Sequence, residues 1–167
     1  MTSVNKWLEL VCGAAEHRVR MAVWTKGQET ASNATVLHGY VYDSQVRAGL
    51  GVLRVETEEL LSSASRLPRL SAKDQRYIAD HVTEFVESAY QNVLAEASKS
   101  FDKGLACRLA QQYEQLKPGI LGSVVLWGEI ESQRRADQVW AVIWDVVRMT
   151  LSAAVGALAT LLATRVL

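Results

Sequence analysis

The chain of 167 residues contains few of the residues that interrupt helices or cross-link loops. It has two prolines, Pro68 and Pro118, and because proline breaks helices, this scarcity favours long helices over a loop-rich fold. It also has two cysteines, Cys12 and Cys107, which lie far apart and form no C-x-x-C pair. We interpret them as reduced, buried hydrophobic residues rather than as a disulfide or metal ligands.

An excess of charge of either sign is missing as well. Lys and Arg together number 18, as do Asp and Glu, and the two signs are interspersed. Nucleic-acid-binding proteins usually have a basic excess or a basic face, so we expect no nucleic-acid partner. The N-terminal segment has no apolar stretch typical of a signal peptide, because charged residues from Glu9 to Arg20 interrupt it. With 49% hydrophobic residues, the chain can form a folded domain with its own core.

The sequence also lacks the local signatures of catalysis and cofactor binding. It contains no G-x-S-x-G nucleophile motif, no phosphate-binding loop and no dinucleotide-binding glycine pattern. The histidines His17, His38 and His81 are not spaced three or four residues from one another or from a cysteine, as metal ligands on a helix are. We therefore expect a non-enzymatic protein with no catalytic residue, cofactor, metal site or small-molecule substrate.

The first helix is predicted over residues 4–26. Apolar residues recur there at steps of three and four, and charged residues fall mostly between them. The apolar face suits a protein core. It also suits a membrane surface, because Trp7 and Trp24 lie near the two ends of the helix with basic residues close by.

The segment that follows gives a weaker signal. Residues 27–35 are polar and predict a turn. Residues 36–42 are ambiguous, because aromatic and β-branched residues favour a strand while no second strand is evident to pair with it. We expect a helix or irregular structure there.

A second helix is predicted over residues 43–67, where leucines and valines share one stripe. Glu56, Glu58 and Glu59 mark its exposed side. Gly49 and Gly51 each cost a helix about 1 kcal/mol relative to alanine, so they indicate a bend or a close helix crossing.

The clearest helical pattern covers residues 71–100. Ser71 and Asp74 form a variant of the capping box, and the apolar stripe follows at steps of four and three. A further helix is predicted over residues 105–116 and ends at Pro118. These helices together predict an all-α fold, an antiparallel bundle of about four to five helices with a long apolar C-terminal helix.

Residues 120–127 form a short apolar patch, which we interpret as the start of a buried helix. Hydrophilic residues follow up to Gln138, and then the composition changes, since residues 139–167 contain only three charged residues. We predict a helical bundle domain over residues 1–138 and an apolar C-terminal helix over residues 139–167. That helix is interpreted as a membrane anchor or as a helix buried within an assembly.

The membrane interpretation rests on the length of the apolar helix and on the residues beside it. A span over residues 146–166 is roughly 31 Å long, close to the thickness of a hydrocarbon core. Four residues are predicted to seat it at the membrane interfaces: Trp140, Trp144, Arg148 and Arg165. Asp145 is spaced to pair with Arg148. Positive charge before the span predicts that the N-terminal bulk is cytoplasmic.

Small and hydroxyl-bearing residues recur at four-residue steps along this helix. They form one stripe, which we predict to be a helix-association face: Ser152, Gly156, Thr160 and Thr164. Such a stripe lets two helix backbones approach closely. A pore lined by its hydroxyls is the weaker interpretation, since hydroxyls bond back to their own helix.

Two functions fit these patterns. The first is a non-enzymatic, membrane-associated helical protein that self-associates through its C-terminal helix, as an anchor, a small membrane effector or a permeabilising protein. The alternative is a soluble, intracellular all-helical subunit of a larger complex or shell. Both require a partner, either membrane lipid or protein subunits, and both favour a homo-oligomer.

Overall fold

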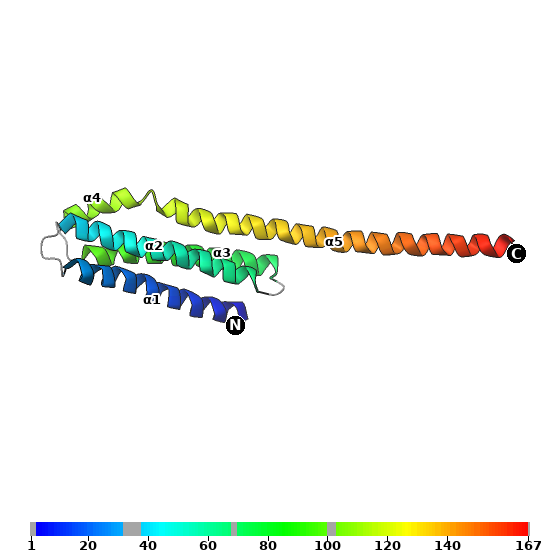
Figure 1. The fold of residues 1–167 in the computed structure, drawn as a ribbon, viewed down its shortest axis with the longest axis horizontal. Coiled ribbons are helices and arrows are strands. Elements are labelled where there is room, and N and C mark those ends of the chain that lie inside the picture. Colours follow the sequence, from blue (N-terminus) through cyan, green and yellow to red (C-terminus); the bar gives the residue numbers. More distant parts are fainter. Residues whose placement is uncertain (1–2, 32–37, 68–69, 100–102, 167) are drawn as a thin grey trace. The chain divides into compact units, whose positions relative to one another are not determined.

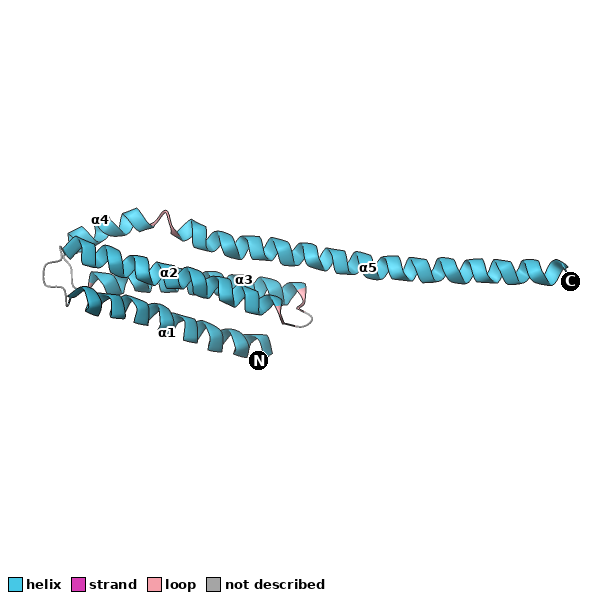
Figure 2. Cartoon of the chain, viewed as in Figure 1, coloured by secondary structure: helices cyan, strands magenta, loops and turns pink. Residues whose placement is uncertain are grey.

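A computed structural model describes the backbone of residues 3–31, 38–67, 70–99 and 103–166. Side chains are described as far as residue 152, apart from positions 3, 31, 38, 103–106 and 109. Within these residues all regular structure is helical (Figures 1 and 2), which confirms the predicted all-α fold. The helices are α1 (Ser3–Ala31), α2 (His38–Ser65), α3 (Ala72–Ser98), α4 (Lys103–Tyr113) and α5 (Lys117–Val166).

The chain divides into two compact units, Met1–Gly128 and Glu129–Leu167. Residues 117–128 of α5 belong to the first unit, and the rest of that helix belongs to the second. The boundary predicted after residue 138 lies inside the second unit.

Three long helices make up most of the first unit. α1, α2 and α3 contact one another in every pairing and run in alternate directions (Figure 1), as an antiparallel bundle requires. Apolar side chains at steps of three and four point inward from each helix. The core contains Leu8, Ala15, Val19, Val23, Tyr42, Val46, Leu50, Leu53, Leu60, Leu61, Ala64, Ile78, Val82, Phe85, Val86, Ala89, Tyr90, Val93, Leu94 and Ala97.

Gly49 marks the closest crossing in this core. A Cβ atom at this position would lie 2.6 Å from Cγ2 of Val23 and 2.8 Å from Cγ1 of Val93. The missing side chain therefore lets α2 approach α1 and α3 together. The close crossing predicted from the paired glycines is confirmed at Gly49, whereas Gly51 faces open space.

The start of α3 is fixed by the predicted capping box. The backbone N–H of Asp74 donates to the Ser71 hydroxyl at 3.1 Å, and the Ser71 N–H donates to the Asp74 carboxylate at 3.0 Å. These bonds from Ser71 lower the pKa of Asp74. Two backbone donors that a helix start leaves without an intrahelical partner are thus satisfied.

The first turns of α5 complete the first unit. Ile120, Val124 and Trp127 are buried at steps of four and three, whereas Val125 and Leu126 are exposed. One face of residues 120–127 is therefore buried, as the interpretation of a buried helix start requires. Trp127 Nε1 donates to the Ser65 hydroxyl of α2 at 2.8 Å. Lys117 lies 3.5 Å from the Glu87 carboxylate of α3, so α5 contacts two helices of the bundle.

The segment predicted as a turn and the ambiguous segment after it are both helical where the structure describes them. α1 continues through Gly27 to Ala31, so the predicted turn is wrong for these residues. Thr30 is buried, and its hydroxyl donates to the Lys26 carbonyl one turn earlier. α2 begins at His38, and burial of the large Tyr42 side chain in the core accounts for helix in the ambiguous segment. Residues 32–37 lie outside the described residues.

Several side chains lie elsewhere than the sequence predicted. Glu56 is buried, not exposed, because a partner on α1 neutralises it. Cys12 is half-buried and Cys107 is exposed, so the prediction of two buried cysteines is wrong.

α4 ends at Tyr113, and Pro118 lies in the first turn of α5, where a helix needs no N–H donor.

Candidate functional site

Arg18 and Glu56 join α1 to α2 through a two-pronged ion pair. Arg18 Nε donates to Oε1 of Glu56 at 2.5 Å, and Nη2 donates to Oε2 at 2.6 Å. The Glu56 side chain is only 8% exposed, so the arginine satisfies a carboxylate that is removed from water. Its hydrogen bond raises the pKa of Arg18 further. Both carboxylate oxygens are occupied, and we assign the pair a structural role.

A second polar cluster ties α4 to the start of α2. The Tyr113 hydroxyl donates to Oδ1 of Asp43, and Arg47 Nε donates to Oδ2 at 2.8 Å. Burial acts to raise the pKa of Asp43, but the two hydrogen bonds outweigh it and lower the pKa below its usual value. Burial and the bond to Asp43 raise the pKa of Tyr113 to about 12. The phenol stays protonated at neutral pH, so this cluster also holds helices together.

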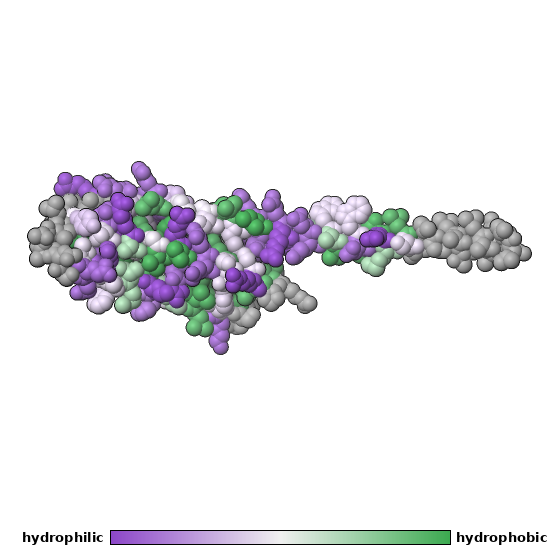
Figure 3. All heavy atoms as spheres, in the orientation of Figure 1, coloured by the Kyte–Doolittle hydropathy of each residue, from purple (hydrophilic) through white to green (hydrophobic). Residues whose placement is uncertain are grey.

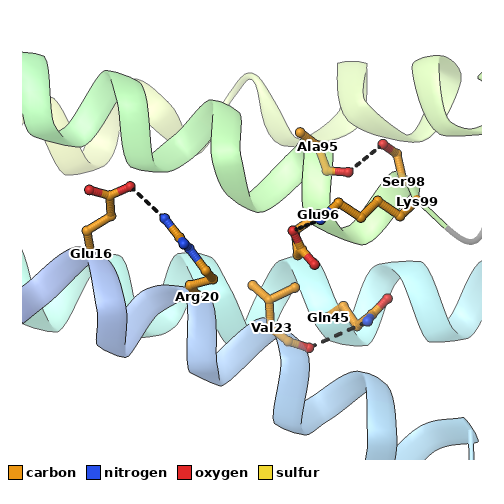
Figure 4. A network of polar contacts seen from close by, with 8 residues as sticks. All are labelled: Glu16, Arg20, Val23, Gln45, Ala95, Glu96, Ser98 and Lys99. Carbon is orange, nitrogen blue, oxygen red and sulfur yellow. Dashed lines mark hydrogen bonds and ion pairs between the residues drawn. The ribbon is translucent and has the colours of Figure 1, made fainter.

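Two hollows lie in a groove between α1 and α3. One hollow has a volume of about 400 Å³, and its lining includes three glutamates and a glycine: Glu9, Glu16, Glu84 and Gly13. A second hollow, of about 380 Å³, shares Glu16. Figure 4 shows the polar contacts beside it, in which Glu16 accepts from Arg20 at 3.1 Å and Glu96 accepts from Lys99. The first hollow has carboxylates but no lysine or arginine in its lining.

The first hollow contains two residues of types that enzymes use in catalysis, Cys12 and His81. Cys12 lines the first hollow, but burial raises the pKa of its thiol, so the reactive thiolate is disfavoured at neutral pH. His81 lines the same hollow, and its Nε2 lies 3.1 Å from the Tyr77 hydroxyl one turn earlier. Among the described side chains, no three of the ligating types lie close enough to hold a metal ion.

The most unusual surface of the chain is the middle of α5. Every residue from 136 to 152 is exposed, on all sides of the helix. Figure 3 shows hydrophobic residues along this part of the chain, next to hydrophilic ones. We call residues 139–151 the apolar segment; its large exposed residues are Val139, Trp140, Val142, Ile143, Trp144, Val146, Val147, Met149 and Leu151.

The predicted seating residues lie partly within this described segment. Trp140 is 61% exposed and Trp144 is 67% exposed, and Arg148 is exposed one turn further along the same helix. Asp145 and Arg148, which are spaced to pair, are both exposed. The side chain of Arg165 lies outside the described residues.

Of the predicted association face, only Ser152 has a described side chain. It is exposed, and its hydroxyl donates to the Arg148 carbonyl at 2.8 Å. The hydroxyl thus bonds back to its own helix, as the argument against a pore anticipated. The side chains of Gly156, Thr160 and Thr164 lie outside the described residues.

Among the residues that the structure describes, no helix is both long enough and apolar enough to cross a membrane.

Comparisons with known proteins find no matching family model, no similar curated protein and no similar solved structure.

Sequence reasoning missed one surface feature. Leu10, Met21 and Trp24 are exposed on α1, on the side away from its buried residues. Besides its inward stripe, the sequence of α1 contains a second stripe at steps of three and four, of which only the terminal tryptophans were singled out. Testing the helix for two faces, rather than for one, would have found it.

Proposed function

We propose that this is a non-enzymatic helical protein that uses α5 to associate with a membrane and with further copies of itself. The observation that carries the proposal is the apolar segment, whose large hydrophobic side chains are exposed on all sides of one helix. Soluble proteins rarely leave a continuous apolar surface of this kind in water. A covering partner, either lipid or protein, is therefore part of the working state.

Membrane lipid is favoured by what the sequence places next to the apolar segment. Residues 149–164 contain no charged residue, and Arg148 and Arg165 flank that run. Two exposed tryptophans, Trp140 and Trp144, precede it by roughly one and a half to two and a half turns, and interfacial aromatic residues lie near the ends of a span. Arg134 and Arg135 precede the segment, and positive charge there favours a bundle on the cytoplasmic side.

Self-association is favoured by the four-residue spacing of small residues. Ser152, Gly156, Thr160 and Thr164 share one helix face by period, and small residues let helices approach closely in lipid. We propose that this face is the contact between copies of α5.

The alternative is a soluble all-helical subunit of a larger assembly, in which protein helices cover the apolar segment. The same exposed surface supports it, since packed protein satisfies apolar side chains as well as lipid does. Alanine and threonine make up much of residues 150–164, which gives this stretch only moderate hydrophobicity.

Membrane fractionation of the full chain, beside a truncation ending at Gln138, tests the proposal. Retention of the full chain in the membrane pellet after an alkaline carbonate wash, with release of the truncation, is the expected result. A double substitution, Val142→Lys with Val147→Lys, should release the full chain as well. Val55→Lys is the matched control, because Val55 is a valine 52% exposed on the bundle.

The two functions give different results in this experiment. A full chain that washes off the membrane and elutes as a defined oligomer supports the soluble assembly. A full chain that is a soluble monomer contradicts both functions.

The proposed contact face is tested separately, by cross-linking in the membrane fraction. Gly156→Leu should reduce the yield of cross-linked oligomer, because a leucine holds the two backbones apart. Ala154→Leu is the control, since it adds a side chain on roughly the opposite side of the helix. Equal yields for the two variants would argue against this face.

A further inference from the structure

α1 has apolar residues on two opposite faces, and only one of them is covered. Leu8, Ala15, Val19 and Val23 are buried in the core. The outer face is a stripe at steps of three, four, three, four and three, which we call the outer stripe: Trp7, Leu10, Ala14, His17, Met21 and Trp24.

The outer stripe is accessible over most of its length. Leu10 is 72% exposed, Met21 is 41% exposed and Trp24 is 53% exposed, while Ala14 and His17 are exposed between them. Trp7 packs partly against the core. Steps that alternate between three and four place residues on the seam of a two-helix coiled coil, so the face is spaced for one more helix.

The order of residues in the stripe identifies that helix. The stripe is nearly symmetric about its centre, with a tryptophan at each end, Leu10 and Met21 next, and Ala14 and His17 in the middle. If a second copy of α1 packs antiparallel, Trp7 faces Trp24, Leu10 faces Met21 and Ala14 faces His17. The first two layers pair side chains of similar size. In the third, the small Ala14 leaves room for the imidazole of His17.

A parallel pairing is less favourable. It would place His17 against His17 and Ala14 against Ala14, so one layer would be polar and crowded and the next would be empty. The antiparallel arrangement also has twofold symmetry, in which each copy uses the same patch, as most homodimers do.

Charge beside the stripe supports the same orientation. In an antiparallel seam Arg20 of one copy lies next to Gly13 of the other, since both flank the seam on the same side. Gly13 is open, with no atom within 4 Å of where a Cβ would lie. It lines the hollow that contains Glu9, Glu16, Glu84 and His81 and no lysine or arginine. Within one chain, Glu16 accepts from Arg20 at 3.1 Å, which leaves Glu9 and Glu84 for the arginine of a second copy. The guanidinium of the second copy therefore enters an acidic hollow.

We propose that α1 is a homodimerisation helix, in which the outer stripes of two copies pack antiparallel and Arg20 of each copy enters the acidic hollow of the other. This contact belongs to the bundle and does not rest on the function proposed for α5. A seam from residue 7 to residue 24 is roughly 27 Å long, so the contact is short and is best detected by trapping it.

Disulfide trapping in the full chain, inside the expressing cells, tests the contact and its direction. The background carries Cys12→Ser and Cys107→Ser. Leu10→Cys and Met21→Cys are then introduced together. These two positions lie eleven residues apart on one helix, roughly 16 Å, so a bond within one chain is excluded. The expected result is a covalent dimer after mild oxidation.

Three controls distinguish the antiparallel contact from a parallel contact and from non-specific cross-linking. Leu10→Cys alone and Met21→Cys alone should give no covalent dimer, because like positions lie roughly 16 Å apart in the antiparallel pair. Val55→Cys with Ser62→Cys places two exposed cysteines on α2 and should also give no dimer. A dimer from Leu10→Cys alone would show a parallel pair and overturn the proposal. No dimer from the double variant, or equal dimer from the α2 control, would overturn it as well.

A charge reversal tests the acidic hollow. Arg20→Glu, added to the cross-linking variant, should lower the yield of dimer several-fold because it places a carboxylate among three others. Arg54→Glu is the matched control, since Arg54 is also an exposed arginine paired with a glutamate four residues away. Adding Glu9→Arg to Arg20→Glu should restore part of the yield. Equal loss from Arg20→Glu and Arg54→Glu would contradict a role for the hollow.

Discussion

The bundle and the apolar segment of α5 contain the same kinds of side chain and expose them differently. In the bundle, polar residues separate the apolar ones at regular intervals, so each long helix has one distinct buried face. In residues 139–151 valine, isoleucine, leucine and tryptophan occur on all sides, and every residue is exposed. The comparison shows that burial depends on the period of apolar residues and not on their number, because one neighbouring helix covers only one face.

Removing a leucine in each region should give the largest contrast. Leu53 is fully buried at the centre of α2, so Leu53→Ala should cost about 2–5 kcal/mol of unfolding free energy through lost contacts and the cavity left behind. Leu151 is 61% exposed, so Leu151→Ala should change the stability of the bundle by less than about 0.5 kcal/mol. Urea denaturation of the full chain, followed by circular dichroism, measures both. Equal losses would contradict the separation of the two regions.

Two glycines of α2 sharpen the comparison within the bundle. Gly49→Ala places a Cβ within 3 Å of Val23 and Val93, and overpacking of this kind costs about 1–3 kcal/mol. Gly51→Ala has open space and should stabilise the helix by about 1 kcal/mol through its better helix propensity. The same denaturation measurement should therefore give shifts of opposite sign. A gain of stability at both positions would show that α2 moves to accept the added atom.

A buried and an exposed tryptophan test how much burial adds to the contribution of an indole to stability. Trp127 is 7% exposed and donates to the Ser65 hydroxyl, so Trp127→Phe should cost about 1 kcal/mol. Trp140→Phe changes an exposed indole and should leave the unfolding transition unchanged. Ser65→Ala should reproduce most of the Trp127→Phe loss, since it removes the acceptor of the same hydrogen bond. An unaltered transition in Ser65→Ala would assign the loss to packing alone.

Alkaline pH should affect the bundle through its buried phenols. The pKa values of Tyr90 and Tyr113 are raised to about 12, mainly by burial, from an ordinary value of 10.0. A raised folded-state pKa means that the stability contributed by each phenol is complete below pH 10 and is lost as the pH rises toward 12. Tyr113→Phe should therefore cost up to about 1 kcal/mol at neutral pH, where it loses the bond to Asp43, and should weaken the fall in stability between pH 10 and 12.

Tyr40→Phe is the control for this pH series, because Tyr40 is 60% exposed. Its profile should follow that of the unsubstituted chain. A profile for Tyr113→Phe that matches the control would contradict the coupling of Tyr113 to Asp43.

Local patterns in the sequence predicted the helices of the bundle well. The stripe from Ile78 to Ala97 and the capping box at Ser71 depend on neighbours within one or two turns, so period and cap residues suffice to locate α3. The glycine crossing at Gly49 was predicted in kind, although only the structure distinguishes it from Gly51.

Tertiary partners account for what the sequence did not predict. Glu56 was expected in water, but Arg18 lies 38 positions earlier in the chain and no local pattern links the two. Residues 38–42 were ambiguous because the burial of Tyr42 decides their conformation. The outer stripe of α1 was missed for a different reason, since its spacing is visible in the sequence but was masked by the stronger inward stripe.

The order of the helices along the chain has a consequence for how the protein is made. α1 packs on α2 and α2 on α3, so most of the bundle forms between segments that are neighbours in the sequence and closes only short loops. Synthesis proceeds from the N-terminus, and these helices leave the ribosome before the apolar segment does. The bundle can therefore fold while the apolar segment is still in the ribosomal tunnel. In a variant with the apolar segment placed first, folding of the bundle would compete with aggregation through that exposed segment.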